Sequence, residues 1–395
     1  MPDSLTSSEP KVLFIYLSSG YGDDEQLALE DIFELNAQGL NWRAVCLSGT
    51  TLHQRFLTFG KSKIVAIDQE PGFFMDRSFR DLLYLEIQGG VSLIHVYGSD
   101  FLGSILPWML KYPRVSVVVS EGPTVEKNIR HYLQSFFYSR IDSFLVPSTA
   151  IKRRLQAMRR ALSGKIRVVH PGLDFNIFNP EHFDFTILRQ KWAIDSNTYL
   201  VGMIASREYV KAQSAFIKAA ASFLRNEELA QRTKFVIIGF EHEGNEDLIE
   251  LIKQFHLQDQ ILLVPEEESI PKVLGTLDVY VLPSSKAMFG IQAIESLAMG
   301  TPIICASGAD SLEWIGNSQS GLVMRSGDSF DMQRKLRMML EDPEELKVMG
   351  TRAVQYAREQ YDRRSRTDRL SQIYERALRR RAILTKTVRK AVAKT

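Results

Sequence analysis

Short apolar runs alternate with longer amphipathic segments along most of the chain. The runs are rich in Val, Ile and Leu, which is typical of strands buried on both faces of a parallel sheet. In the first half they cover residues 12–17, 43–47, 64–67, 93–97, 115–119, 143–146 and 166–169. Segments with helical periodicity, such as residues 25–37 and 149–162, lie between them. This alternation predicts a doubly wound α/β domain.

A turn-rich stretch at residues 170–180 interrupts the pattern, and a second series of runs follows it. Its predicted strands are residues 200–204, 235–238, 261–264, 279–282 and 302–306. Its predicted helices include residues 212–225, 246–256 and 290–299, and after Asp328 only three helical segments remain. We therefore predict two doubly wound Rossmann-like domains, residues 1–178 and 179–360, and a helical tail at 361–395.

The composition is that of a folded protein, with 45% hydrophobic and 24% charged residues among 395. This length suffices for two sizeable cores. The net charge of +2 gives no basis for binding nucleic acid. Cys46 and Cys305 both lie in apolar segments, which predicts reduced core thiols. The first apolar run is too short for a signal or membrane-spanning segment, so we expect a cytoplasmic protein.

The small net charge conceals a basic tail, residues 376–395, which has eight basic residues and no acidic one. Removing these eight charges changes the net charge of +2 to −6. Residues 143–173 form a second basic segment without acids, in which Ile151, Leu155, Met158 and Leu162 recur at helical spacing. Two interpretations stay open for these segments: solvated helix faces, or attachment to an anionic inner membrane surface, where the protein would be peripheral.

The most informative stretch is residues 278–302, DVYVLPSSKAMFGIQAIESLAMGTP. A buried strand leads through a Pro-Ser turn to a helix that starts near Gly290 and stops at Gly300. Free N–H groups at Phe289, Gly290 and Ile291 predict an anion site at the helix start. Glu295, further along this helix, is placed to accept hydrogen bonds from a ribose diol; the alternative is an exposed glutamate on a packing helix.

This stretch resembles the GT-B glycosyltransferases of family 4, whose pattern is PS-x-x-E-x-FG-x-x-x-x-E-A-x-A-x-G-x-P. The matching positions are Pro283, Ser284, Phe289, Gly290, Glu295, Ala298, Gly300 and Pro302. Similar matches occur at residues 168–178, VVHPGLDFNIF, and at residues 202–213, GMIASREYVKAQ. The resemblance covers almost the whole chain and implies a GT-B fold.

The resemblance implies that the second domain binds a nucleotide-sugar donor. Glu295 would then hold the ribose, and Lys211 would offset the charge of the departing diphosphate. The family's arginine position is Ser206, and Arg207 lies one residue later. Since neighbouring strand residues point to opposite faces, Arg207 can substitute only if the strand has already ended. The first glutamate of the family's pair is replaced by Ala287.

In the first domain, the family's histidine after a Val-rich strand has Glu121 as its nearest counterpart. Two roles stay open for Glu121, a carboxylate facing the donor sugar and a loop acid that caps the next helix. Gly20 and Gly22 follow the first strand and would let backbone amides approach a phosphate. The acids at 23–25 would repel that phosphate.

The resemblance implies a retaining, metal-independent transferase that needs no cofactor and moves a sugar from a nucleoside diphosphate to a glycan or lipid-linked acceptor. Envelope polysaccharide or lipopolysaccharide synthesis is the implied setting. No Asp-x-Asp, P-loop or HExxH pattern occurs, which argues against metal-dependent GT-A enzymes, P-loop NTPases and zinc proteases. The changes at Ser206, Ala287 and Glu121 motivate an alternative, a catalytically impaired GT-B protein that binds a partner or senses a nucleotide.

Overall fold

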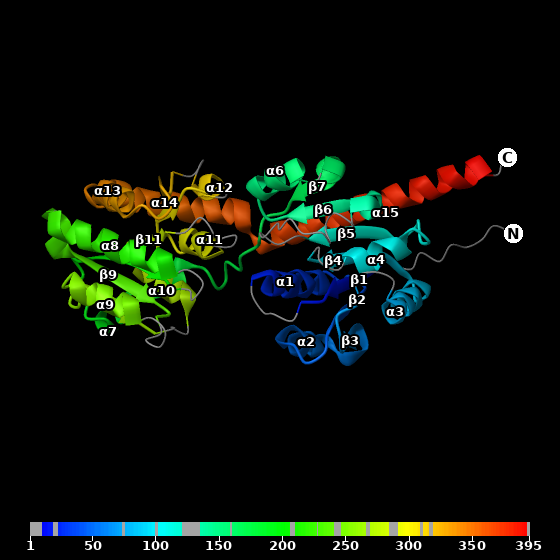
Figure 1. Cartoon of the computed structure of the whole chain (residues 1–395), viewed down its shortest axis with the longest axis horizontal. Helices are drawn as coiled ribbons and strands as arrows, with labels where there is room; N and C mark the ends of the chain where they lie inside the picture. Colours follow the sequence, from blue (N-terminus) through cyan, green and yellow to red (C-terminus); the bar gives the residue numbers. More distant parts are fainter. Residues whose placement is uncertain are drawn as a thin grey trace. The chain divides into compact units, whose positions relative to one another are not determined.

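Within the described residues of the computed structural model, two parallel sheets are flanked by helices (Figure 1). The structure describes residues 10–18, 23–72, 76–98, 102–120, 135–158, 160–205, 210–226, 228–240, 246–265, 269–283, 291–308, 311–315 and 319–392. Because each sheet is covered by helices on both faces, its strands are buried on both sides, as the apolar runs predict.

The first sheet has the strand order β3-β2-β1-β4-β5-β6-β7. Its strands are β1 (Lys11–Tyr16), β2 (Trp42–Leu47), β3 (Ile64–Ile67), β4 (Val91–Tyr97), β5 (Ser116–Ser120), β6 (Ser143–Val146) and β7 (Ile166–Val168). The helices between them are α1 (Asp23–Ala37), α2 (Thr51–Phe56), α3 (Arg77–Gln88), α4 (Leu102–Met109) and α6 (Thr149–Met158). All seven strands predicted for this half are confirmed, with ends that differ by a residue or two.

The second sheet has the order β10-β9-β8-β11-β12-β13. Its strands are β8 (Tyr199–Ile204), β9 (Thr233–Ile238), β10 (Ile261–Val264), β11 (Val279–Leu282), β12 (Ile303–Ala306) and β13 (Gly321–Met324). The helices that follow Gly172 are α7 (Thr186–Lys191), α8 (Val210–Asn226), α9 (Glu246–Gln254), α10 (Ile270–Thr276), α11 (Ile291–Ala298), α12 (Ser311–Ile315), α13 (Ser329–Leu340), α14 (Pro343–Tyr361) and α15 (Arg363–Val392).

Five of the six strands in this sheet are confirmed, and β13 is the one that sequence reasoning missed. It is short, and it begins with Gly321, a residue type that normally weakens a strand. The reason for the glycine is close packing, because a Cβ at Gly321 would lie 2.1 Å from the backbone oxygen of Ile303. The neighbouring strand β12 therefore leaves no room for a side chain there.

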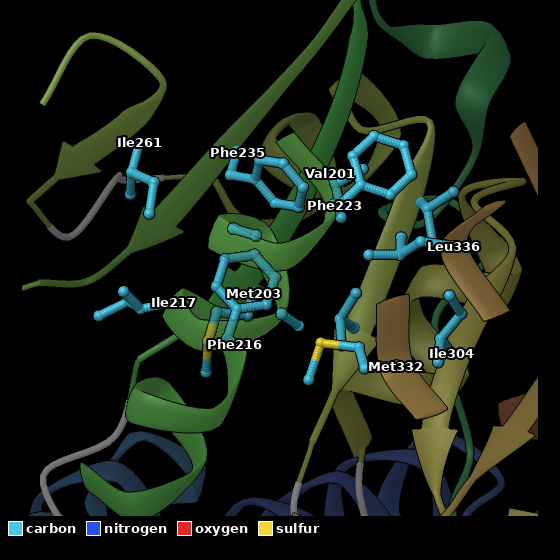
Figure 2. Packing of buried hydrophobic residues seen from close by; sticks show 14 of the residues in the cluster. Val201, Met203, Phe216, Ile217, Phe223, Phe235, Ile261, Ile304, Met332 and Leu336 are labelled. Carbon is cyan, nitrogen blue, oxygen red and sulfur yellow. The ribbon is translucent and has the colours of Figure 1, made fainter. Parts of the chain in front are cut away.

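Alternate residues of the second sheet form one face of a large apolar core (Figure 2). Val201 and Met203 of β8 point into it, and Phe216 of α8 and Met332 of α13 cover them. This face therefore lies beneath α8 and α13. Cys305 lies in β12 of this unit and Cys46 in β2 of the other; both thiols are buried, as predicted, and burial raises the pKa of Cys46 to about 11.

The chain divides into two compact units, Met1–Gly172 with Arg363–Thr395, and Leu173–Asp362. We expected boundaries after residues 178 and 360 and a separate helical tail. The structure instead makes α15 part of the first unit. The reason is apolar burial, because Leu370, Tyr374 and Ala377 of α15 pack into the core formed by β1, β4 and α1.

A buried ion pair joins α15 to α1. The guanidinium of Arg366 donates from Nε and Nη2 to the carboxylate of Asp31, at 2.6 and 2.8 Å. Its Nη1 donates to the carbonyls of Val169 and His170, at 2.9 and 2.6 Å. The side chains of Arg366 and Asp31 are only 5% and 1% exposed. Tyr97 donates a further hydrogen bond to Asp31 at 2.9 Å, so both charged groups are well satisfied.

The basic tail begins inside this packed helix. Arg381 donates to the carboxylate of Asp142 and to the backbone oxygen of Arg140, both at 2.9 Å, and its side chain is 11% exposed. Arg376, Arg379 and Arg380 are exposed. Arg381 therefore belongs to the folded unit and holds α15 against the loop before β6.

Replacing Arg366 by Met should lower the free energy of unfolding of the first unit by about 3–5 kcal/mol, because the substitution leaves the Asp31 charge buried and unpaired. Urea unfolding followed by circular dichroism measures the change. Arg369→Met, at an exposed position of the same helix, should change it by less than about 0.5 kcal/mol. Equal stabilities of the two variants would contradict the assignment.

Candidate active site

The order of strands in the second sheet reverses between β8 and β11, which pair in parallel. In sheets of this kind, the connections from the two strands at such a reversal leave toward opposite faces, and ligands bind outside the carboxyl ends of these strands. β8 ends at Ile204 and β11 ends at Leu282. The segments that follow these two residues contain most of the predicted donor-binding residues.

Helix α11 begins at Ile291, directly after the Phe289-Gly290 pair. The free N–H groups of its first turn and its positive dipole end suit an anion. The helix stops before Gly300, whose φ of 78° confirms the predicted glycine stop. Gly350 of α14 packs against this turn, where a Cβ would lie 2.5 Å from the Gly300 oxygen. Close packing of α14 thus supports the position of α11.

Glu295 lies half-buried in the second turn of α11, close enough to Tyr280 of β11 for its charge to act on the phenol. Burial, together with the negative charge of Glu295, raises the pKa of Tyr280. The Tyr280 hydroxyl oxygen also accepts a hydrogen bond from the backbone N–H of Ile204, the last residue of β8. Glu295 is therefore partly shielded from solvent and lies beside β11, one of the two strands of the switch point.

The structure describes only some of the residues predicted for the donor site. Ile291 and Glu295 are described, and Lys211 lies in the first turn of α8, where only its backbone is described. Outside the described residues lie Gly20, Gly22, Glu121, Ser206, Arg207, Ser284, Ala287, Phe289 and Gly290. Among the side chains that are described, no three His, Cys, Asp or Glu residues are grouped so as to hold a metal ion.

The end of β8 bears on the choice between Ser206 and Arg207. The strand ends at Ile204, and Ala205 follows outside it. Ser206 and Arg207 themselves lie outside the described residues, so the role of Arg207 stays a prediction.

The first sheet has its own reversal of strand order, between β1 and β4. The segment with Gly20 and Gly22 follows β1 there, and α1 begins at Asp23, close to the helix start that the sequence predicts. Strand β5 ends at Ser120, directly before Glu121. Both predicted sites of this unit thus follow the carboxyl ends of strands.

A buried chain of polar groups lies at the carboxyl ends of β4 and β5, and sequence reasoning missed it. His95 of β4 makes hydrogen bonds to the Ser120 hydroxyl at 2.8 Å through Nε2 and to the Tyr374 hydroxyl at 2.7 Å through Nδ1. Tyr374 comes from α15, which was expected to be a separate tail. The available signal was a histidine in an otherwise apolar strand.

His95 is neutral at physiological pH. Burial, and secondly the positive charge of Arg366, lower its pKa to about 3. A neutral imidazole has one N–H donor and one acceptor nitrogen, and its two hydroxyl partners can supply either role. The side chain is therefore fully satisfied without charge, next to the strand end that leads to Glu121.

Comparisons with known proteins find similarity to glycosyltransferases. Residues 184–356 match the family model of glycosyl transferases group 1. A D-inositol 3-phosphate glycosyltransferase of Nocardia farcinica is 25% identical over 247 residues, which are 61% of this chain and 54% of the relative. The chain thus aligns with little more than half the length of this curated relative.

Solved structures resemble almost the entire chain. A glycosyltransferase from Rickettsia africae superimposes with a TM-score of 0.78 at 16% identity, over 94% of this chain and 99% of the other. HepE from Anabaena, in complex with UDP, has a TM-score of 0.77 at 16% identity, over 92% and 99% of the two chains. The chain has the GT-B fold. The predicted fold is thereby confirmed, and the family match lies within the second unit.

The depressed pKa of His95 predicts a loss of stability in acid. The unfolded chain takes up the proton near the ordinary pKa of 6.5, and the folded protein only near 3, so stability falls as the pH drops from 6.5 toward 3. Between pH 7 and pH 5 this contribution is about 2 kcal/mol. His95→Gln should remove that part of the pH dependence in urea unfolding.

His53→Gln is the matched control, because His53 is a half-buried histidine of the same unit. This variant leaves His95 and its two hydroxyl partners in place, so it should keep the part of the pH dependence that His95 causes. The assignment fails if His95→Gln loses as much stability as the wild type between these two pH values.

Proposed function

We propose that this protein is a retaining, metal-independent glycosyltransferase of family 4. It would transfer a sugar from a nucleoside diphosphate donor to a glycan or lipid-linked acceptor, in envelope polysaccharide or lipopolysaccharide synthesis. The observation that carries the proposal is Glu295 at the strand switch point, inside the segment that matches glycosyl transferases group 1. The GT-B fold and the curated glycosyltransferase relatives support it.

The donor site in this proposal is built around α11. The Glu295 carboxylate accepts hydrogen bonds from the ribose hydroxyls, as acidic residues do in related nucleotide-binding sheets. The start of α11, with Ser284, Phe289, Gly290 and Ile291, receives the diphosphate, because its N–H groups and dipole favour an anion. HepE, which shares the fold, has been crystallised with UDP-glucose, and this supports a nucleotide sugar as the donor class.

In this proposal, catalysis depends on stabilising the negative charge of the departing diphosphate. When the bond between the anomeric carbon and the diphosphate oxygen breaks, negative charge grows on the diphosphate. Lys211 in the first turn of α8 and Arg207, earlier in the sequence, offset that charge. Because the charge is larger in the transition state than in the bound donor, this interaction lowers the activation barrier. Glu121, which follows β5 in the sequence, is the catalytic carboxylate that we propose.

Glu295→Ala should weaken binding of UDP by at least about tenfold, because the ribose hydroxyls lose their charged acceptor. Isothermal titration calorimetry measures the affinity. Glu295→Gln, which keeps one carbonyl acceptor, should give an intermediate value. Glu250→Ala removes an exposed glutamate of α9 and should leave binding unchanged. Equal affinities for wild type and Glu295→Ala would contradict the ribose assignment.

Turnover assays on the same proteins distinguish the proposed enzyme from the alternative, a catalytically impaired binding protein. The changes at Ser206, Ala287 and Glu121 motivate this alternative. Release of UDP from UDP-glucose, or transfer of the sugar to an added glycan, supports the enzyme. Binding that Glu295→Ala abolishes, without turnover of UDP-, GDP- or ADP-sugars, supports the nucleotide-sensing alternative.

We further propose that the end of α15 contacts an anionic membrane from the cytoplasmic side. No helix in the described part of the chain has the length and hydropathy needed to span a bilayer. Arg381 belongs to the folded unit, so the available charge lies in the exposed Arg376, Arg379 and Arg380 and in residues 384–395, which contain Lys386, Arg389, Lys390 and Lys394. Each basic residue near such a surface contributes about 1 kcal/mol.

Deleting residues 384–395 should weaken binding to acidic vesicles at least about tenfold, through the loss of four basic residues. Flotation with phosphatidylserine vesicles measures this, and phosphatidylcholine vesicles are the control. A deletion from residue 376 is unsuitable, because it also removes Ala377 and Arg381 from the packed helix. No flotation of the full chain, or equal flotation after deletion, would sink the membrane proposal.

A further inference from the structure

A cavity of about 430 Å³ lies in the second unit, between the carboxyl ends of β12 and β13 and the helix α13. Ser307 directly follows β12, and Arg325 directly follows β13. Phe330, Asp331, Arg334 and Lys335 line it from α13. A volume of this order holds a small ligand. The proposed function gives this cavity no role.

The charge of the lining favours an anion. Arg325, Arg334 and Lys335 are three cations against the single carboxylate of Asp331. Both oxygens of that carboxylate are occupied: Oδ1 accepts from Arg334 Nη2 at 2.8 Å, and Oδ2 accepts from the Arg325 backbone N–H at 2.8 Å. Asp331 is 4% exposed, so it lies beneath the cations and does not face an incoming ligand as a free charge.

The two arginines are held in place by acids around the cavity. Arg334 is fixed by Asp331, and Arg325 pairs with Asp328 at 3.0 Å. A guanidinium has five N–H donors, and these contacts use only some of them. The side chains of Arg325 and Arg334 are 72% and 54% exposed, so the remaining donors are accessible. Donors that are positioned before binding lose less entropy when a phosphate arrives.

The cavity also offers an apolar contact. Phe330 lines it and is 67% exposed, so its ring is accessible to the organic part of a ligand. Asp328 already accepts the N–H groups of Phe330 and Asp331, so these two amides are not available to a ligand. The recognition of an anion therefore depends on the three cationic side chains, and the recognition of its organic part depends on Phe330.

We propose that this cavity binds a small phosphorylated molecule, with its phosphate among Arg325, Arg334 and Lys335 and its organic part against Phe330, at a site separate from the donor site. Both sites lie at the carboxyl edge of one parallel sheet, where ligands bind in α/β proteins. β12 and β13 continue this edge beyond β11, so the cavity is set apart from the switch point beside Glu295.

Line broadening in ³¹P NMR during titration of the full chain tests the site, with inorganic phosphate and glucose 6-phosphate as probes. Lys335→Ala should weaken binding of both probes at least about tenfold, because it removes a charged donor. Arg337→Ala removes a cation of the same helix that does not line the cavity, and it should change nothing. Equal affinity in the wild type and Lys335→Ala overturns the proposal.

Two further comparisons separate this site from others. Glu295→Ala and saturating UDP should both leave phosphate binding unchanged, and displacement of phosphate by UDP would place it in the donor site and overturn the proposal. Glucose 6-phosphate should bind more tightly than inorganic phosphate, and Phe330→Ala should remove the difference. Equal affinities of the two probes for the wild type would contradict the organic contact at Phe330.

Discussion

The first unit depends on one buried charge pair. Arg366 and Asp31 are almost fully shielded from water, and each would be costly to bury alone. Because Arg366 also holds the carbonyls of Val169 and His170, the pair joins α15, α1 and the segment after β7 in one network. The same helix brings Tyr374 to His95, so the polar groups at the ends of β4 and β5 depend on α15 as well. The final helix is therefore part of the folding unit that begins at the other end of the chain.

The parts of the fold that could be predicted are those that leave a local pattern in the sequence. Strands of a parallel sheet are buried on both faces, so their apolar runs are visible in the sequence, and twelve of the thirteen described strands follow from them. The exception, β13, begins with a glycine that close packing against Ile303 requires, and no local pattern reveals such a contact. Partners far apart are equally hidden: Arg366 and Asp31 are separated by 335 positions, and Arg381 and Asp142 by 239.

In the candidate site, too, local features could be predicted from the sequence and packing contacts could not. The position of Glu295 follows from sequence, because a helix start, a glycine stop and their spacing are local features. Its proximity to Tyr280, and through it to the end of β8, depends on how α11 packs on the sheet. The same holds for His95, whose neutral state depends on burial and on a cation that lies more than two hundred residues away in sequence. Local chemistry could thus be predicted, whereas the environment that tunes it could not.

A single parallel sheet can supply more than one ligand site, because all of its carboxyl ends meet at one edge. In the second unit, β8 and β11 end beside Glu295, whereas β12 and β13 end beside the basic cavity of α13. The first position combines a carboxylate with a helix start, a pairing that suits a ribose and a diphosphate together. The second has cationic side chains above an ion-paired carboxylate and a helix start whose amides are partly capped, so it attracts a phosphate mainly through those side chains. The two positions therefore differ in the groups that recognise an anion, and substitutions in one need not disturb the other.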